Sequence, residues 1–266
     1  MTSMLAPDLL DRRALAHLAF VDALGRAVRS PVAIDGDRVS TARKQDGTIA
    51  LLSAGGFEKY SATFDAPPGS PSTGSKSLEL VLKPTDAKLM SRIVTLALPR
   101  DPRGKNRGKA DSLFTPVKIV LLPSVNETGD GFSSLVRVSL RRKSDKASIG
   151  NALIEGKTDD GKFSAISVTD SRGEAALLFA NLPLTFPAAQ GSIKRTIKAK
   201  IIARVDDRVA SFEAVNASSG PVAAETLRPI DPDSPRSGTQ PDFSLGQSVE
   251  LSAGTVASVA IEWSKP

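Results

Sequence analysis

Apolar and polar residues alternate over short runs along most of the chain, and turn-forming residues separate these runs. Val, Ile, Leu and Thr dominate the runs, while Gly, Pro, Asp and Ser interrupt them. This pattern is typical of antiparallel strands joined by turns. The predicted strands are Leu15–Asp22, Ser30–Ile34, Thr48–Leu52, Tyr60–Phe64, Ser77–Leu82, Arg92–Leu98, Ser133–Arg141, Ala152–Glu155, Ala175–Phe179, Ile193–Val205, Ser248–Leu251 and Val256–Trp263.

One segment near the N-terminus departs from the strand pattern. Pro7 stands at a plausible first helical position and is followed by Asp8 and Asp11. Acidic side chains complement the positive end of a helix dipole. A short N-terminal helix is therefore predicted before Ala14.

The two halves of the sequence resemble each other. Gly47 to Leu52 matches Gly173 to Leu178, and each segment follows a strand, a turn and a second strand. Both halves also close on two consecutive strands. The similarity indicates one sandwich unit used twice. Because tight connections often need a positive φ, Asp46-Gly47 and Arg172-Gly173 are predicted as hairpin corners.

The length of 266 residues favours two domains. We expect an all-β chain of two tandem antiparallel β-sandwiches after an N-terminal segment at 1–14. Domain 1 is predicted at 15–100, a basic linker at 101–110, and domain 2 at 111–266 with a Pro-rich loop at 231–241. That loop and Pro67–Ser75 are expected to be exposed and mobile.

Composition narrows the classes of protein further. The chain has no cysteine, which excludes disulfides and thiolate chemistry, and its net charge of +6 comes from largely interspersed charges. The first twenty residues carry charges where a signal peptide needs an apolar core, and no run of eighteen apolar residues occurs. These features predict a cytoplasmic protein without a signal peptide or membrane insertion; release within a particle stays open.

Residues with catalytic or metal-binding chemistry are sparse. His17 is the only histidine and lies in an alternating run, so it is expected to be a half-buried strand residue. The pairs Asp35/Asp37 and Asp159/Asp160 stand beside glycine, as turn residues do, and neither follows the spacing of a dedicated calcium loop. No glycine-rich phosphate loop is present. We predict a non-enzyme with no catalytic, metal or cofactor residues.

A basic run offers the strongest candidate for partner binding. Arg103, Lys105, Arg107 and Lys109 follow Arg100, and only Asp101 and Asp111 offset their charge locally. The run fits an acidic protein surface or phosphates, or simply a solvated linker. Nucleic acid is disfavoured because single-strand binding normally adds aromatic stacking platforms, and the run contains no aromatic residue.

Aromatic residues also limit carbohydrate binding. They make up 5% of the chain, with one Trp and one Tyr, whereas lectin-like sandwiches present several exposed rings. Trp263 and Tyr60 keep a glycan-binding or protein-binding module as the alternative, provided that one ring is exposed.

Short motifs resemble a known family. Ser167 to Ala175, followed by Asn181-Leu182-Pro183, is similar to the strand-turn pattern of carboxypeptidase-regulatory-like domains, and Val21 to Val28, Asp46-Gly47-Thr48 and Gly56 to Tyr60 are a weaker version. The resemblance implies small transthyretin-like or immunoglobulin-like sandwiches. The tandem arrangement around Leu96 to Asp101 resembles accessory proteins of phage-tail-like contractile injection systems.

This resemblance implies a function for the predicted fold. It favours a structural or adaptor component of a phage-tail-like particle that contacts neighbouring protein subunits through loops and sheet edges. The residues expected to make these contacts are Arg103, Lys105, Arg107 and Lys109, together with the loop at 231–241. An enzyme of transthyretin-like fold is a third interpretation.

Overall fold

The computed structural model describes residues 14–62, 71–183, 186–188, 191–193, 196–206, 209–213, 229–233 and 246–264. Strands dominate these residues, which confirms the all-β prediction. The described helical segments are short: helix α1 spans Glu58–Ala62 and the 3-10 turn η1 spans Gly104–Asn106. None of the helices in these ranges has the length and apolar composition needed to span a bilayer. The helix expected before Ala14 lies outside the described residues.

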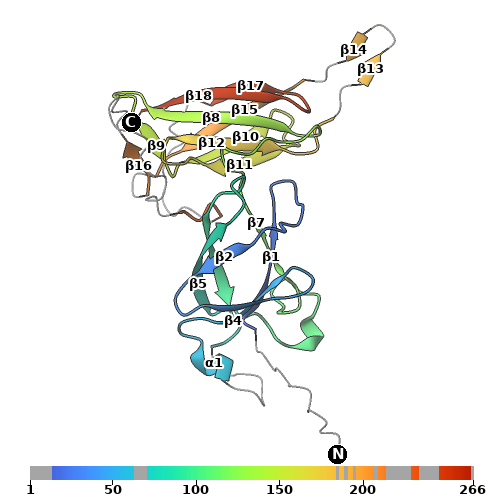
Figure 1. Cartoon of the computed structure of the whole chain (residues 1–266), viewed down its shortest axis with the longest axis vertical. Helices are drawn as coiled ribbons and strands as arrows, with labels where there is room; N and C mark the ends of the chain where they lie inside the picture. The colour runs from blue at the N-terminus through green and yellow to red at the C-terminus, as the bar shows by residue number, and fades with distance from the viewer. Residues whose placement is uncertain are drawn as a thin grey trace, which may run out of the picture. The chain divides into compact units, whose positions relative to one another are not determined.

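Figure 1 shows the order of the strands along the chain. The first seven are β1 Ala16–Val21, β2 Val32–Asp35, β3 Ser40–Arg43, β4 Ile49–Ser53, β5 Lys76–Pro84, β6 Arg92–Leu98 and β7 Val117–Val120. The remaining strands are β8 Ser134–Arg142, β9 Ser148–Gly150, β10 Leu153–Thr158, β11 Ser164–Val168, β12 Glu174–Phe179, β13 Phe186–Ala188, β14 Gly191–Ile193, β15 Ile197–Arg204, β16 Ser211–Glu213, β17 Gln247–Leu251 and β18 Val256–Trp263.

The chain divides into two compact units. Unit 1 draws on residues 1–20, 34–81 and 95–119, and unit 2 draws on 21–33, 82–94 and 120–266. The predicted division at 1–14, 15–100, 101–110 and 111–266 differs, because 101–110 falls inside unit 1. The physical reason is strand pairing over a long sequence separation: β7 joins the sheet β3-β4-β1-β7 at β1, so the chain beyond 110 returns to the first sheet.

Unit 2 is a β-sandwich. One sheet has the order β11-β10-β15-β17, and the other joins β12, β8, β9, β16 and β18. Apolar side chains from both sheets form one core, including Val138 on β8, Ile154 on β10 and Ile201 on β15. Strand β8 alternates buried and more exposed residues from Val136 to Leu140, whereas every residue of β12 after Glu174 is buried. One pairing departs from the predicted antiparallel pattern: β18 runs parallel to β8.

Unit 1 places its apolar residues on the inner positions of its strands. Leu18 on β1, Leu51 on β4 and Leu80 on β5 are fully buried. Strands β3 and β4 form a hairpin whose corner is Gly47 at φ 83°, which confirms the predicted Asp46-Gly47 turn. The carboxylate of Asp46 accepts the Thr48 N–H at 2.9 Å and fixes this turn.

Two local predictions are wrong. Tyr60 lies in helix α1 instead of a strand, because Phe57 and Tyr60, three residues apart, are both buried, and helical spacing brings such residues to one face. Arg172-Gly173 is a turn with φ 72° at the glycine, but it connects β11 and β12 in different sheets and is therefore no hairpin within one sheet.

Candidate interaction site

The basic run forms an ordered loop between β6 and β7 in unit 1. Its base is closed by backbone hydrogen bonds from the Asp101 N–H to the Asp111 carbonyl, 2.9 Å, and from the Leu113 N–H to the Asp101 carbonyl, 2.8 Å. Ser112 beside them is fully buried. The segment predicted as an interdomain linker is thus a structured loop of one compact unit.

The buried side chain of Asp101 organises the loop from within. Its carboxylate accepts the Arg103 backbone N–H at 2.9 Å and the Asn106 side-chain amide at 2.5 Å. The guanidinium of Arg103 also lies 3.2 Å from it. The hydrogen bond from the Arg103 N–H, the one from Asn106 and the nearby charges of Arg103 and Lys109 lower the pKa of Asp101 below its usual value. The carboxylate is therefore charged at neutral pH.

All four predicted candidates, Arg103, Lys105, Arg107 and Lys109, are exposed on this loop. Arg103 is partly neutralised by Asp101. Within the part of the chain that the structure describes, no carboxylate lies within ion-pair distance of Lys105, Arg107 or Lys109. Backbone bonds from the Arg107 N–H to Gly104, 3.2 Å, and from the Lys109 N–H to Asn106, 2.9 Å, hold the loop in consecutive turns. Three positive charges without an ion pair among the described residues are thereby presented on a fixed backbone.

Phe114 adds an aromatic group that the run itself lacks. The guanidinium carbon of Arg107 lies 4.8 Å from the centre of the Phe114 ring, a cation–π arrangement. The Thr115 hydroxyl donates to the Arg107 carbonyl at 3.1 Å. Arg107 is consequently held more firmly than a free surface arginine. The signal for this contact in the sequence is only the presence of an aromatic residue seven positions later.

Arg100, the first cation of the run, stabilises the loop and does not belong to the exposed basic surface. Its guanidinium donates to the Ala110 carbonyl, and burial lowers its pKa while Asp111 opposes that shift. Its Nε atom is buried and has no hydrogen-bond partner among the described residues. Arg100 therefore joins the two ends of the loop and is not part of the exposed basic surface.

The residues considered for catalysis or metal binding, His17 and Asp160 among them, lie in different elements of the fold. His17 is half-buried on β1 as predicted, and burial followed by the charge of Lys44 lowers its pKa. Asp160 accepts the Thr158 hydroxyl at 2.7 Å and the Lys162 N–H at 3.1 Å, as a turn residue does. Throughout the described ranges, no group of three or more acidic or histidine side chains could hold a metal ion.

The two rings proposed for a glycan site are both buried. Tyr60 and Trp263 are each 2% exposed. The Trp263 ring belongs to the core of unit 2 and lies 5.8 Å from the ring of Phe212, measured between centroids. Neither ring can stack on a sugar in this conformation, which removes the feature on which the glycan alternative depended.

The described start of the predicted Pro-rich loop is anchored at Asp231, whereas Asp233 is exposed, as the sequence predicted for this loop. Asp231 contacts the buried Arg92, and the Ile93 N–H donates to the Ile230 carbonyl at 2.9 Å. The rest of the loop, 234–241, lies outside the described residues. The sequence signal for this anchor was an arginine at an inward position of a strand.

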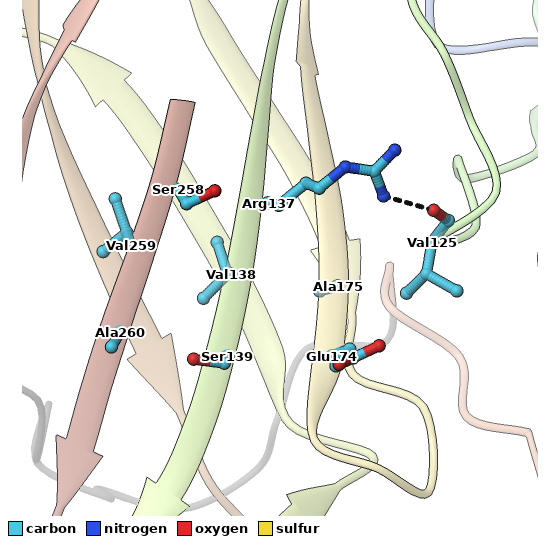
Figure 2. A pocket seen from close by; sticks show the side chains of 9 residues that line it. All are labelled: Val125, Arg137, Val138, Ser139, Glu174, Ala175, Ser258, Val259 and Ala260. Atoms are coloured by element: carbon cyan, nitrogen blue, oxygen red, sulfur yellow. Dashed lines mark hydrogen bonds between the residues drawn. The ribbon is translucent and has the colours of Figure 1, made fainter. Parts of the chain in front are cut away.

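Unit 2 carries an open groove of about 370 Å³ on the outer face of β8, β12 and β18 (Figure 2). Its floor consists of small side chains, including Ser139, Ser258 and Ala260. Figure 2 shows Arg137 extending away from the floor, where its guanidinium donates to the Val125 carbonyl. Of the two titratable residues that line the groove, Arg137 and Glu174, Arg137 is thus directed to the neighbouring backbone and not to the floor.

No family model matches the chain, and no curated protein matches it significantly. Three solved structures resemble it weakly: the TIE protein of Bacillus anthracis (7% identity, TM-score 0.24, 94% of this chain and 33% of that chain), the major pilin subunit BcpA of Bacillus cereus (10%, 0.26, 90% and 55%), and catechol 1,2-dioxygenase from Pseudomonas arvilla C-1 (9%, 0.23, 53% and 55%). The chain thus spans only a third to about half of their lengths. At these TM-scores the likeness supports no functional argument, and it does not support the resemblance to injection systems.

Proposed function

We propose that this protein is a non-enzymatic structural or adaptor component that binds a neighbouring protein subunit through the basic loop, defined here as residues 101–115. The observation that carries the proposal is the exposure of Lys105, Arg107 and Lys109, without described anionic partners, on a backbone fixed by Asp101. A pre-organised charged surface loses little conformational entropy on binding and attracts an oppositely charged partner over distance. The partner is an acidic protein surface.

The resemblance found in the sequence suggests a phage-tail-like particle as the assembly. In such a particle the loop would contact a sheath, tube or baseplate subunit. A protein partner is favoured over single-stranded nucleic acid because Phe114 is the one aromatic residue of the described chain with a ring contact to the basic loop, and Arg107 already lies over its ring. Sequence-tolerant strand binding normally uses several stacking rings along a basic groove.

Affinity purification from the native host tests this proposal. The tagged wild-type chain is compared with a triple variant, Lys105→Glu, Arg107→Glu and Lys109→Glu. A matched control reverses three exposed cations on strands: Lys118→Glu, Lys157→Glu and Lys198→Glu. Co-purifying proteins are identified by mass spectrometry, and the complexes are imaged by electron microscopy.

The proposal predicts that wild type and control recover the same subunits and that the loop variant loses about tenfold or more of them. Recovery should also fall as salt rises, because exposed charges are screened. Equal recovery by the loop variant would refute the role of the basic loop. Recovery of a protein assembly that is unlike a phage tail would refute the finer assignment alone.

A further inference from the structure

Among the strands that the structure describes, β18 forms an open edge of the sandwich. Strand β18 pairs with β8 on one side over all eight of its residues, in continuous register from Val256 to Trp263. Among the described strands, none pairs with its other side. Figure 1 shows β18, coloured red, beside β8 in unit 2. An unpaired edge of this kind presents backbone groups to another strand.

The hydrogen bonds to β8 identify which backbone groups are free. The Leu135 N–H donates to the Thr255 carbonyl at 2.9 Å, and the Lys143 N–H donates to the Trp263 carbonyl at 2.7 Å. In a parallel ladder alternate residues face the same neighbour. The odd-numbered residues of β18 therefore bond to β8, and Val256, Ser258, Ala260 and Glu262 direct their N–H and carbonyl groups to the open edge.

Two other sheet edges in the described residues, at β6 and β3, are protected. Strand β6 has seven residues, but the Ile93 N–H is taken by Ile230, and Arg92 introduces a charge there. Strand β3 has four residues and a register shift at Ser40. Strand β18 is the longest edge strand and contains no Pro, Gly, Lys or Arg. It lacks the devices by which proteins normally prevent edge pairing.

We propose that β18 pairs with β18 of a second copy of this chain, antiparallel and about a two-fold axis. The register places Val256 opposite Glu262 of the second copy, Ser258 opposite Ala260, and Val259 opposite Val259. The four facing pairs of even-numbered residues then exchange roughly eight backbone hydrogen bonds. This inference goes beyond the proposed function, and it concerns unit 2 and not the basic loop.

The charge and the apolar residues of β18 favour a second copy of the chain as the partner of this edge. Glu262 is the single charged residue of β18, and it already pairs with Lys146 at 2.5 Å. In the two-fold register it faces Val256, so no like charges oppose each other. On the inner face, the half-buried Ala257 and Val259 belong to the margin of the core. Pairing sets Val259 against its own copy and Ile261 against Ala257, which continues the apolar row.

Sedimentation analysis of the purified full chain over a concentration series tests the pairing. Ala260→Pro removes an N–H that faces the open edge and leaves the bonds to β8 intact. Ser258→Lys places a charge on the same edge. The control is Ser139→Lys, which adds the same charge to the same face of the interior strand β8, where Ser139 pairs with Ala260. The fluorescence of Trp263, the only tryptophan, reports whether each variant is folded.

The wild type should double in mass by about 100 µM, a concentration that detects weak dimers. Each edge variant should raise the dissociation constant about tenfold or more, and the control should change it less than about twofold. In the cysteine-free chain, Val259→Cys should form a disulfide-linked dimer on oxidation, because directly opposed side chains lie close enough. A monomeric wild type, a dimer unaffected by both edge variants, or the absence of the cross-link would overturn the proposal.

Discussion

Arg92 contacts two carboxylates, and burial and distance give opposite predictions of which contact stabilises the fold more. The guanidinium of Arg92 is 2% exposed and lies 3.3 Å from Asp231, whose side chain is 10% exposed. It lies closer, 2.6 Å, to Asp233, whose side chain is 64% exposed. Further bonds run to the Val120 carbonyl at 2.7 Å and to the Ile93 carbonyl at 3.2 Å. If distance decided the energetics, Asp233 would be the more important partner.

We expect the more buried partner, Asp231, to contribute more to stability than the closer partner, Asp233. Removing the partner of a buried charge costs about 3–5 kcal/mol because the remaining charge is left uncompensated in a medium of low polarity. Asp231→Asn keeps the shape and one acceptor oxygen, so we expect the free energy of unfolding of unit 2 to fall by about 2–3 kcal/mol. Asp233→Asn breaks an exposed contact that water can replace, and should cost about 0–1 kcal/mol.

Urea unfolding followed by Trp263 fluorescence measures both variants, because this tryptophan belongs to the core of unit 2. With a slope of about 2 kcal/mol per molar urea, the midpoint should fall by about 1–1.5 M for Asp231→Asn and by less than about 0.5 M for Asp233→Asn. Arg92→Met is a useful third variant, because it removes the charge itself. An equal or larger loss for Asp233→Asn would refute the argument from burial.

Three further predictions concern single residues. Because the pKa of His17 is lowered on folding, the unfolded chain binds the proton first, so unit 1 should lose stability as pH falls below about 6.5; His17→Gln should remove this part of a pH series of thermal melts. Gly173→Ala should destabilise unit 2 by about 4 kcal/mol or more, because φ is positive and the new methyl carbon would lie 2.4 Å from the Leu140 carbonyl oxygen. Gly47→Ala also has a positive φ but open space around it, and should cost about 1–2 kcal/mol. Urea unfolding measures both variants, and similar losses of stability would contradict the steric argument. Asp101→Ala should speed hydrogen exchange in the basic loop and weaken partner binding severalfold, and unchanged exchange rates would show that this carboxylate does not order the loop.

Alternation along the chain was sufficient to predict most strands. The observed bounds Arg92–Leu98 and Val256–Trp263 agree with the predicted ones, because inward and outward residues alternate from Val94 to Leu98 and along the whole of β18. The segment at Tyr60 failed because five residues are too few to separate a strand from one helical turn. Burial of Phe57 with Tyr60 decides the case, and burial is a tertiary property.

The connections between strands were harder to predict. Gly47 and Gly173 both have a positive φ, yet the turn at Gly47 joins neighbouring strands in one sheet and the turn at Gly173 joins two sheets. A turn specifies a reversal of direction and not the sheet that the next strand enters. For the same reason the sequence did not predict the parallel pairing of β18 with β8.

The sequence predicted which residues of the candidate site are exposed, but it did not predict that the loop carrying them has a fixed structure. A charged run with Pro and Gly indicates exposure, and Arg103, Lys105, Arg107 and Lys109 are exposed. The same composition suggested a linker, because the buried role of Asp101 depends on Asn106 and on a backbone bridge to Ser112. These contacts join residues at the two ends of the loop, and the sequence does not show that the two ends lie together.

The most direct test of the basic loop is zero-length cross-linking of the native assembly. A carbodiimide joins lysine amines to carboxylates that are already in ion-pair contact, and mass spectrometry identifies the linked peptides. We expect links from Lys105 or Lys109 to Asp or Glu residues of another protein subunit, at a higher yield than from the exposed Lys157 and Lys198. If Lys105 and Lys109 form no link to another subunit while those control lysines do, the basic loop is not the site of partner binding.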